Sequence, residues 1–237
     1  AARYNRLTVD DGLSQNSVYS ILSDHQGFMW FATADGLNRY DGYEFKHYRH
    51  DPNDIASLSS SNISVLFEDN NGTLWVGTQD GGLNQYDRQT QRFIRFMPDA
   101  INPHSLSHPN VSAIAQDAKG NLWVGTWGGG LNRYIAEQER FEHYRHHPAD
   151  PNSLSQDSVS SIYHDSKNNL WVGTAGGGLN RLNNTTGDFV HFTHSKDKTS
   201  ISDNTINTLF EDKQGVLWIG SDNGLNQYDA KSQSFIQ

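Results

Sequence analysis

The stretch GNLWVGTWGGGLNRY, residues 120–134, decides the fold, because it recurs with small changes along the whole chain. Its Leu-Trp-Val-Gly core stands again at residues 74–77 and 170–173, and a Leu-Asn pair follows each copy after a short loop. The repeated tryptophans are Trp30, Trp75, Trp123, Trp171 and Trp218, separated by 45, 48, 48 and 47 residues. Repetition at this period indicates one supersecondary unit present five times.

Each repeat predicts four short strands and no helix. The first strand, as at 111–115, has apolar residues at odd and even positions, which indicates burial on both faces. The second contains Leu-Trp-Val and the third Leu-Asn, while the fourth, as at 141–144, alternates like an outer strand with one wet face. Repeated units of this kind predict an all-β protein, a β-propeller of five four-stranded blades. We expect one domain over residues 1–237, with repeats at approximately 13–57, 58–105, 106–153, 154–200 and 201–237.

Two glycine positions in the repeat carry structural expectations. A glycine three residues before the tryptophan, as at Gly120, predicts a left-handed turn. The fourth repeat has Asn168 there, and asparagine tolerates positive φ better than most residues. A second glycine two residues after the tryptophan, as at Gly125, predicts close approach of a neighbouring sheet.

The composition excludes several classes of protein. Only 35% of the 237 residues are hydrophobic, yet 11% are aromatic, which is too rich for a disordered chain. The net charge is −9, so the basic footprint of a nucleic-acid partner is missing. No run approaches 18 apolar residues, and we expect no membrane contact by this segment. The absence of cysteine excludes disulfides and thiolate chemistry.

The repeated pattern G-x-L-W-[VI]-G-[TS]-x-x-G-L-N, preceded by L-S-x-[ND]-x-V and Asp, resembles the two-component regulator propeller repeat. The resemblance covers nearly all of residues 7–235. It implies the periplasmic sensor region of a membrane-anchored signalling protein whose output is a hybrid histidine kinase or a diguanylate cyclase. It also implies a ligand such as a carbohydrate fragment and signalling domains of the parent protein as partners. Such sensor regions usually contain many more blades than five, so the chain resembles a portion of one.

The two ends of the chain suggest how a five-bladed ring would close. Residues 3–9 occupy the fourth-strand position before the first repeat, and the last repeat stops at the start of its own fourth strand. We expect Tyr4 to Val9 to pair with the third strand near residues 225–228 and complete the last blade. The alternative is a fragment of a larger propeller, with open faces that favour association.

Candidate binding residues lie in the loops between the second and third strands, where propeller sites usually form. Trp127 stands outside the structural tryptophan series beside three glycines, and its ring could stack on a sugar. The alternative is packing on a neighbouring blade. Three further loop candidates are Asp35, Asp80 and Asp222, which suit tight turns equally well.

Three arginines follow the Leu-Asn pair and are further candidates, since they would give a partly cationic channel lining if they faced the axis. They are Arg39, Arg133 and Arg181, and the alternative is a solvated blade surface. The asparagine that precedes them occurs in every repeat, which indicates a hydrogen-bonding role within the loops. Histidine pairs spaced H-x-x-H recur in the fourth strands, where residues three apart point to opposite faces, so we predict no metal site. We also predict no cofactor.

Three hypotheses for function remain. The first is a non-catalytic sensor that binds a small ligand, such as a saccharide, or a partner domain. The second is a propeller glycosidase, although no carboxylate pair stands out except the loop aspartates. The third is a scaffold for assembly.

Overall fold

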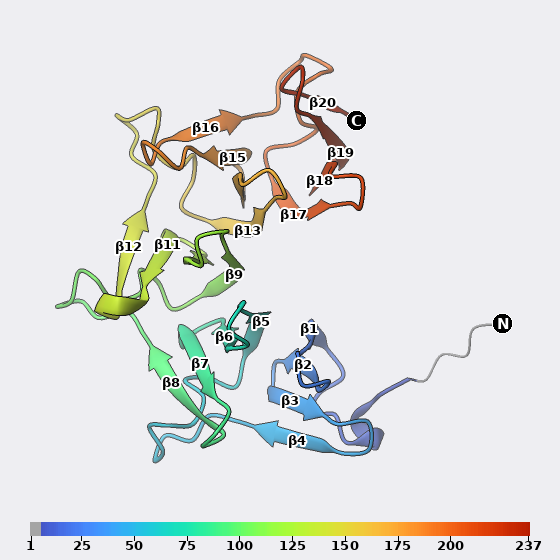
Figure 1. Ribbon diagram of the computed structural model, residues 1–237, viewed down its shortest axis with the longest axis vertical. Coiled ribbons are helices and arrows are strands. Elements are labelled where there is room, and N and C mark those ends of the chain that lie inside the picture. The colour runs from blue at the N-terminus through green and yellow to red at the C-terminus, as the bar shows by residue number, and fades with distance from the viewer. Residues whose placement is uncertain (1–5) are drawn as a thin grey trace. The chain divides into compact units, whose positions relative to one another are not determined.

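The computed structural model describes residues 6–237, and this part contains twenty strands. The strands form five four-stranded antiparallel sheets, so the predicted five four-stranded blades are confirmed (Figure 1). The chain divides into two compact units, which are described separately. Unit 1 runs as far as Pro98 and includes Pro109–Val111, and unit 2 comprises Asp99–His108 and Ser112–Gln237.

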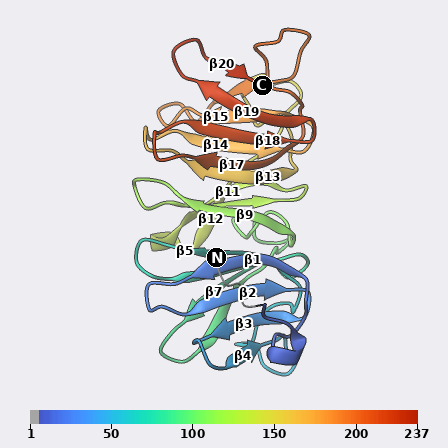
Figure 2. The same cartoon turned by 90° about the vertical axis from the view of Figure 1, so that its right-hand side faces the viewer.

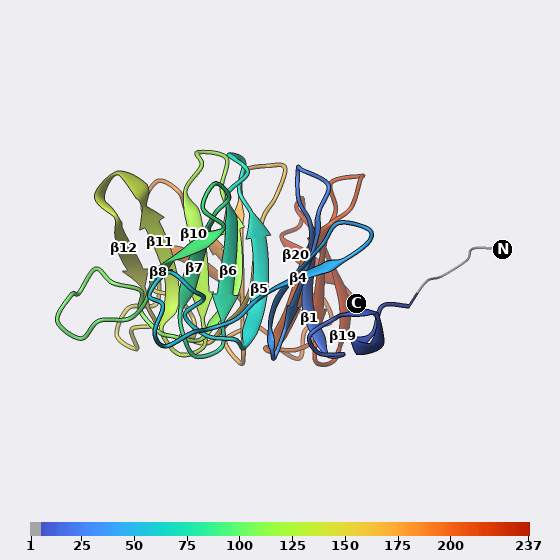
Figure 3. The same cartoon turned by 90° about the horizontal axis from the view of Figure 1, so that it is seen from below.

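Unit 1 holds two sheets whose strands are paired in chain order. The first sheet consists of β1 (Val18–Ser23), β2 (Met29–Thr33), β3 (Gly36–Tyr40) and β4 (Phe45–Tyr48). The second consists of β5 (Ile63–Glu68), β6 (Leu74–Thr78), β7 (Leu83–Asp87) and β8 (Arg92–Phe96). Figure 3 shows β5, β6, β7 and β8 following one another across the second sheet.

Unit 2 holds the other three sheets. The third sheet consists of β9 (Val111–Gln116), β10 (Leu122–Thr126), β11 (Gly130–Ile135) and β12 (Arg140–Tyr144). The fourth consists of β13 (Val159–His164), β14 (Leu170–Thr174), β15 (Leu179–Leu182) and β16 (Phe189–Phe192). The fifth consists of β17 (Ile206–Glu211), β18 (Leu217–Ser221), β19 (Gly224–Asp229) and β20 (Ser234–Ile236). The fourth and fifth sheets stack face to face, as Figure 2 shows for β13–β15 and β17–β19.

The core of each unit lies between consecutive sheets and is centred on the repeated tryptophans. Trp30 in unit 1 and Trp171 in unit 2 are completely buried, each among aromatic side chains of its own and the next sheet. The tight packing explains the glycine that stands two residues after the tryptophan in the third and fourth repeats. A Cβ on Gly173 would clash with the Ser161 hydroxyl and lie 2.6 Å from Ile206 Cγ2 in the next sheet. The predicted close approach of a neighbouring sheet is therefore confirmed at Gly125 and Gly173, whereas a Cβ on Gly220 would meet only Thr208 of its own sheet.

The predicted left-handed turn before each tryptophan is also confirmed. Gly120 has a φ of +84°, and Asn168, which replaces glycine in the fourth repeat, has a φ of +64°. Asparagine is one of the few other residues that occupies this region at modest cost. The turn joins the first strand of each blade to the second, and we call this end of the blades the hairpin end.

The described part of the chain contains two single-turn 3₁₀ helices, at Val9–Asp11 and Ala136–Gln138, where the sequence predicts none. The first corrects the interpretation of the amino end. Thr8 caps the turn: its amide donates to Asp11 Oδ2 at 2.8 Å and its hydroxyl accepts from the Asp10 amide. This capping box satisfies backbone groups locally and competes with strand pairing.

The predicted closing strand is not observed. Tyr4 lies outside the described residues, and residues 6–9 belong to no strand. The fourth strand of the last sheet is β20, which places Phe235 opposite Tyr228 and Ile236 opposite Gln227. Local capping by Thr8 explains why the described end of the predicted strand turns instead of extending.

Candidate functional site

A hydrogen-bonded aspartate–tryptophan pair organises the hairpin end of every blade, and it is fully buried in the first and fourth blades. The indole Nε1 of each repeated tryptophan donates to the aspartate six residues before it, at 2.7–2.9 Å. The other carboxylate oxygen accepts backbone amides of the turn, as Asp117 Oδ1 does from Lys119 and Asn121. Burial tends to raise the pKa of Asp117, but hydrogen bonds from Asn121 and Trp123 outweigh burial and hold this pKa below 3.8. The aspartate is therefore a permanent anion near neutral pH.

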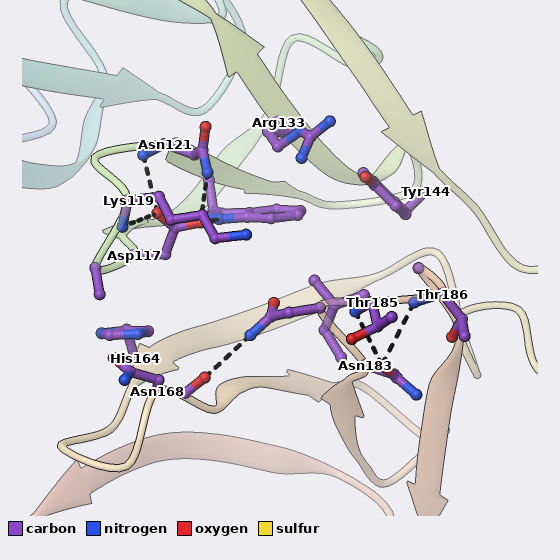
Figure 4. A pocket seen from close by; sticks show the side chains of 15 residues that line it. Asp117, Lys119, Asn121, Arg133, Tyr144, His164, Asn168, Asn183, Thr185 and Thr186 are labelled. Atoms are coloured by element: carbon purple, nitrogen blue, oxygen red, sulfur yellow. Dashed lines mark hydrogen bonds between the residues drawn. The ribbon is translucent and has the colours of Figure 1, made fainter.

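The first candidate site, groove A, lies at the hairpin end of unit 2 between the third and fourth sheets. It has a volume of about 390 Å³, within the range of about 300–1,000 Å³ typical of small-molecule sites. Figure 4 shows Asp117, Lys119 and Asn121 on one side, and His164, Asn168 and Thr185 on the other. Amides, hydroxyls, a carboxylate and an ammonium group therefore face one space, which suits a ligand with several hydroxyl groups.

The inner wall of groove A is aromatic and cationic. Arg133 lies over Trp123, with its Cζ 5.8 Å from the ring centroid, and Tyr144 packs against the same indole at 5.4 Å. The Arg133 guanidinium also donates to Glu142 Oε2 at 2.5 and 3.1 Å. Because its charge is paired, Arg133 shapes the wall of the groove more than it attracts an anion.

The second candidate site, groove B, is the equivalent space between the fourth and fifth sheets. Its volume is about 370 Å³, and Asp165, Arg181, Glu211 and Tyr228 are among its lining residues. The Arg181 guanidinium lies 5.5 Å from the Trp171 ring centroid and donates to the Tyr228 hydroxyl at 3.3 Å. Arg181 thus repeats the place of Arg133 one blade further on.

The structure places the three predicted arginines on the faces of the third strands, over the repeated tryptophans. In unit 1, Arg39 is opposite Trp30 in the strand register, and its Cζ lies 4.4 Å from the Phe28 ring centroid. These contacts do not give the channel lining considered from the sequence, because each guanidinium packs on an aromatic ring of its own blade. Strand register explains this position. The residue that follows the Leu-Asn pair is directly opposite the repeated tryptophan in the antiparallel sheet, as Arg133 is opposite Trp123 and Arg181 is opposite Trp171.

The remaining candidates lie at the opposite end of the blades, in the loops that join second and third strands. In unit 2, Trp127 is 42% exposed, and its backbone forms an isolated bridge with Ser158. The Gly128 and Gly130 amides both donate to the Asp157 carbonyl, at 3.1 and 2.8 Å. Asp222 accepts a hydrogen bond from Asn207 Nδ2 at 2.8 Å. The indole therefore projects from a fixed loop, whereas the Asp222 carboxylate contacts the first strand of its own blade.

Two candidates belong to unit 1. Asp35 forms an exposed ion pair with Arg49 at 2.9 Å, so its carboxylate is already paired. Asp80 lines a shallow pocket of about 380 Å³ together with His50, Met97 and the serines of residues 59–61. The predicted site residues are thus divided between two ends of the blades and do not form one cluster within either unit.

The repeated asparagine and the histidine pairs have local roles. Asn180 is completely buried: its Oδ1 accepts from the Ser155 amide at 3.0 Å, and its Nδ2 donates to the Ser155 hydroxyl and the Val172 carbonyl. The predicted loop hydrogen bonding is therefore confirmed. His191 Nε2 lies 2.7 Å from the Ser153 carbonyl oxygen, and His194 Nδ1 lies 2.8 Å from that of Ile201. Among the described residues, no group of three or more potential ligands could hold a metal ion.

Sequence reasoning missed the residues that line groove A from the fourth sheet. Asn184 and Thr185 stand just after the third strand, and His164 stands just before the repeated aspartate. Each differs from its counterparts in other repeats, so a position-by-position comparison of the repeats carries the signal.

The five four-stranded sheets, each with an aspartate–tryptophan turn, are the blades of a β-propeller. The description of the matching family is two component regulator propeller, and the matched residues are 12–35, 57–80, 105–128, 153–176 and 200–223, just over half of the chain. The chain belongs to this family. The described part contains no helix with the length and hydrophobicity to cross a bilayer.

Similar structures are extracellular domains of bacterial signalling proteins. The extracellular domain of BT3049 from B. thetaiotaomicron, described as a hybrid two component system, has a TM-score of 0.87 and 30% identity over 98% of this chain and 31% of its own. The extracellular domain of BT4673 from the same organism, described as a one component system, has a TM-score of 0.80 and 26% identity over 99% and 33%. The chain spans about a third of the length of either domain.

Two further similarities are narrower. Histidine kinase P4 of Formosa agariphila is 48% identical over 56 residues, which are 24% of this chain and 4% of the kinase. Virginiamycin B lyase from Staphylococcus aureus has a TM-score of 0.66 and 16% identity over 92% of this chain and 68% of the lyase. A likeness at that identity shows the propeller fold alone.

Proposed function

We propose that this chain is part of the ligand-sensing region of a bacterial two-component signalling protein. The observation that carries the proposal is the similarity of 98% of the chain, at 30% identity, to the extracellular domain of a hybrid two component system. In this role the propeller recognises a ligand on the outer side of the cytoplasmic membrane and catalyses no reaction. Other domains of the parent protein produce the signal.

The ligand class that fits this role is a saccharide, with Trp127 as the stacking surface. Its indole is 42% exposed, and the Asp157 carbonyl holds the loop on both sides of Gly129. Ser107 and His108 lie against the same glycine turn, next to Gly129. A loop whose backbone is already held loses little freedom when a sugar stacks on its indole, which favours affinity.

A binding screen with a panel of oligosaccharides, by isothermal titration calorimetry, tests this proposal. We expect a saccharide that binds the unaltered chain and loses about fivefold in affinity with Trp127→Ala, since one aromatic contact contributes about 1 kcal/mol. Tyr43→Ala, which removes a loop ring that is 95% exposed in unit 1, is the matched control and should leave the affinity unchanged. A hit that Trp127→Ala does not weaken refutes the Trp127 site. If no saccharide binds, the proposal of a saccharide ligand is refuted, and the result favours the hypothesis of a scaffold for assembly.

The carboxylates of the hairpin end support a non-catalytic role. A glycosidase needs one carboxylic acid whose pKa is raised so that it can donate a proton to the leaving group. Hydrogen bonds instead lower the pKa of Asp24, Asp117 and Asp212, the last through Trp218 and the Val216 amide. Hydrolysis of chromogenic glycosides that Asp80→Asn abolishes would overturn this part of the proposal.

A further inference from the structure

Unit 1 contains an internal arginine clamp at the hairpin end, between its two sheets. Arg88 follows β7, and its guanidinium donates to Asp24 Oδ2 at 2.8 Å and to Glu68 Oε1 at 2.7 Å. Its Nε donates to the Gly72 carbonyl at 2.9 Å. The two carboxylates and the carbonyl therefore form a three-point acceptor for one planar guanidinium, the geometry in which charge-assisted hydrogen bonds are strongest.

Groove B presents the same three acceptors without the arginine. Counted from the repeated tryptophans, Asp165, Glu211 and Gly215 take the places of Asp24, Glu68 and Gly72. The local contacts match too. Glu211 Oε2 accepts the Ser166 amide at 2.8 Å, just as Glu68 Oε2 accepts the His25 amide at 3.0 Å.

The place of the arginine itself is empty in groove B. Counted from the Leu-Asn pair, Ala230 takes the position of Arg88, and a methyl group cannot reach the acceptors. Ala230, Asp165, Glu211 and Gly215 all line the cavity of about 370 Å³. The shorter side chain is therefore what opens groove B.

Groove A lacks this arrangement. There, Asn184 takes the arginine position, and its Nδ2 donates to the Asn168 carbonyl at 3.0 Å. His164 stands where unit 1 has Glu68, so the second carboxylate is missing. Groove A, groove B and the equivalent space in unit 1, which Arg88 fills, therefore differ at two positions that decide whether a guanidinium is held internally, excluded or admitted.

Three side chains already reach these acceptors in groove B. Asn169 Nδ2 donates to Asp165 Oδ2 at 2.8 Å, where the first repeat has Phe28, and the Ser166 hydroxyl donates to Glu211 Oε1 at 2.7 Å. An entering guanidinium must therefore share or replace the hydrogen bond from Asn169.

The third side chain is a lysine. The Nζ of Lys167 is 3.5 Å from the Gly215 carbonyl, longer than the 2.7–2.9 Å of the Arg88 contacts, and the side chain is exposed. The Arg181 cation is engaged with Trp171 and the Tyr228 hydroxyl on the inner wall. A long contact from an exposed lysine is readily displaced by a group that reaches all three acceptors.

We propose that groove B is a binding site for a guanidinium group, supplied by free arginine or by an arginine side chain of a peptide. The entering group takes the place that Arg88 takes in unit 1 and donates to Asp165, Glu211 and the Gly215 carbonyl. This site is separate from the saccharide site proposed at Trp127, so either can fail alone.

Isothermal titration calorimetry of the chain with L-arginine and with Nα-acetyl-L-arginine amide tests the proposal, with Nα-acetyl-L-lysine amide as the matched cation. We expect the two arginine compounds to bind and the lysine compound to bind at least tenfold more weakly. A preference for the capped amide indicates a peptide arginine, and a preference for L-arginine indicates the free amino acid. The proposal is overturned if no arginine compound binds at millimolar concentration, or if lysine binds equally well.

Variants locate the site. Glu211→Gln should weaken arginine binding at least tenfold, while Glu137→Gln, which removes an exposed carboxylate elsewhere in unit 2, should leave it unchanged. Ala230→Arg should fill groove B with an internal guanidinium that makes the contacts Arg88 makes in unit 1. It should therefore abolish arginine binding and raise the melting temperature. Lys167→Ala should strengthen binding by removing the competitor. Arginine binding that survives both Glu211→Gln and Ala230→Arg contradicts the assignment to groove B.

Discussion

Among the described residues, Asp24 Oδ2 accepts side-chain hydrogen bonds from the Trp30 indole and the Arg88 guanidinium, and replacing Arg88 with alanine removes the second. The side chain of Asp24 is completely buried, whereas those of Arg88 and Glu68 are 19% and 15% exposed. Glu68 can regain water once the guanidinium is gone, but Asp24 is enclosed and regains little. The cost of the substitution therefore comes mainly from an uncompensated buried carboxylate.

The magnitude follows from these contacts. A hydrogen bond to a charged group contributes about 1.5–3 kcal/mol, and breaking a buried ion pair costs about 3–5 kcal/mol. Because the groove is partly open to water, we expect Arg88→Ala to lower the free energy of unfolding by about 3 kcal/mol. The matched control is Arg92→Ala, which breaks an exposed pair with Asp54 and should cost less than about 1 kcal/mol.

An asparagine contact found in two other repeats suggests a second substitution that should restore part of the stability lost in Arg88→Ala. In the third and fourth repeats an asparagine side chain donates to the turn aspartate, at 2.8 Å from Asn121 to Asp117 and from Asn169 to Asp165. The first repeat has Phe28 at that position. Phe28→Asn should therefore destabilise the unaltered chain, because it loses ring packing, but should recover about 1 kcal/mol in the Arg88→Ala background.

Urea unfolding followed by tryptophan fluorescence and far-UV circular dichroism measures these differences. If the two units unfold separately, only the transition of unit 1 should move, since Arg88, Asp24 and Glu68 all belong to it. The reasoning is refuted if Arg88→Ala costs no more than Arg92→Ala, or if Phe28→Asn is equally harmful in both backgrounds.

The cost of Arg88→Ala should also depend on pH. Burial tends to raise the pKa of Asp24, but hydrogen bonds from Trp30 and Arg88 outweigh burial and lower this pKa below 3.8. A carboxylate with a lowered folded-state pKa stabilises the fold above its unfolded-state pKa and loses this contribution as the pH falls through the folded-state value. The part of the difference between the unaltered chain and Arg88→Ala that comes from Asp24 should therefore be full above about pH 5 and shrink below about pH 4.

Two further substitutions test the packing of unit 2. Asn180→Ala leaves the buried Ser155 amide and the Val172 carbonyl each without a hydrogen bond that Asn180 now makes, and should cost about 2–3 kcal/mol in urea unfolding; Asn184→Ala, at an exposed position, is its control. Gly173→Ala forces a methyl group against Ser161 and Ile206 and should cost about 1–3 kcal/mol. Gly220→Ala meets only the Thr208 side chain within 3 Å and should cost less, so equal losses at both glycines would contradict the packing argument.

The repeated features were predictable from the sequence because each recurs five times and depends on local backbone chemistry. A glycine replaced once by Asn168 identifies a positive-φ turn, and the observed φ of +64° agrees. The fold class followed from the same periodicity. The amino-terminal strand was wrongly expected over residues 6–9, because Thr8 and Asp11 form a capping box there, a signal that acts over three residues and competes with distant pairing.

The candidate site was harder to predict, because it depends on side chains that meet across neighbouring blades. The contacts of Arg88 with the first blade could not be predicted from the sequence of its own repeat. Its partners Asp24 and Gln26 lie more than 60 residues away along the chain. Arg133 and Arg181 were named from the sequence as candidate ligand-binding residues, but which group each one contacts follows from strand register and the aromatic ring opposite it.

All five repeats therefore share the aspartate–tryptophan turn, but they differ in the side chain that donates to Oδ2 of the turn aspartate. Arg88 contacts it in the first repeat, and Asn121 and Asn169 contact it in the third and fourth. In the fifth repeat the Trp218 indole donates to Asp212. A side chain that satisfies the turn from within its own repeat leaves the neighbouring groove free, whereas Arg88 closes the groove it crosses. Differences between blades in ligand binding should therefore arise at these positions, since the turn itself tolerates any of the arrangements.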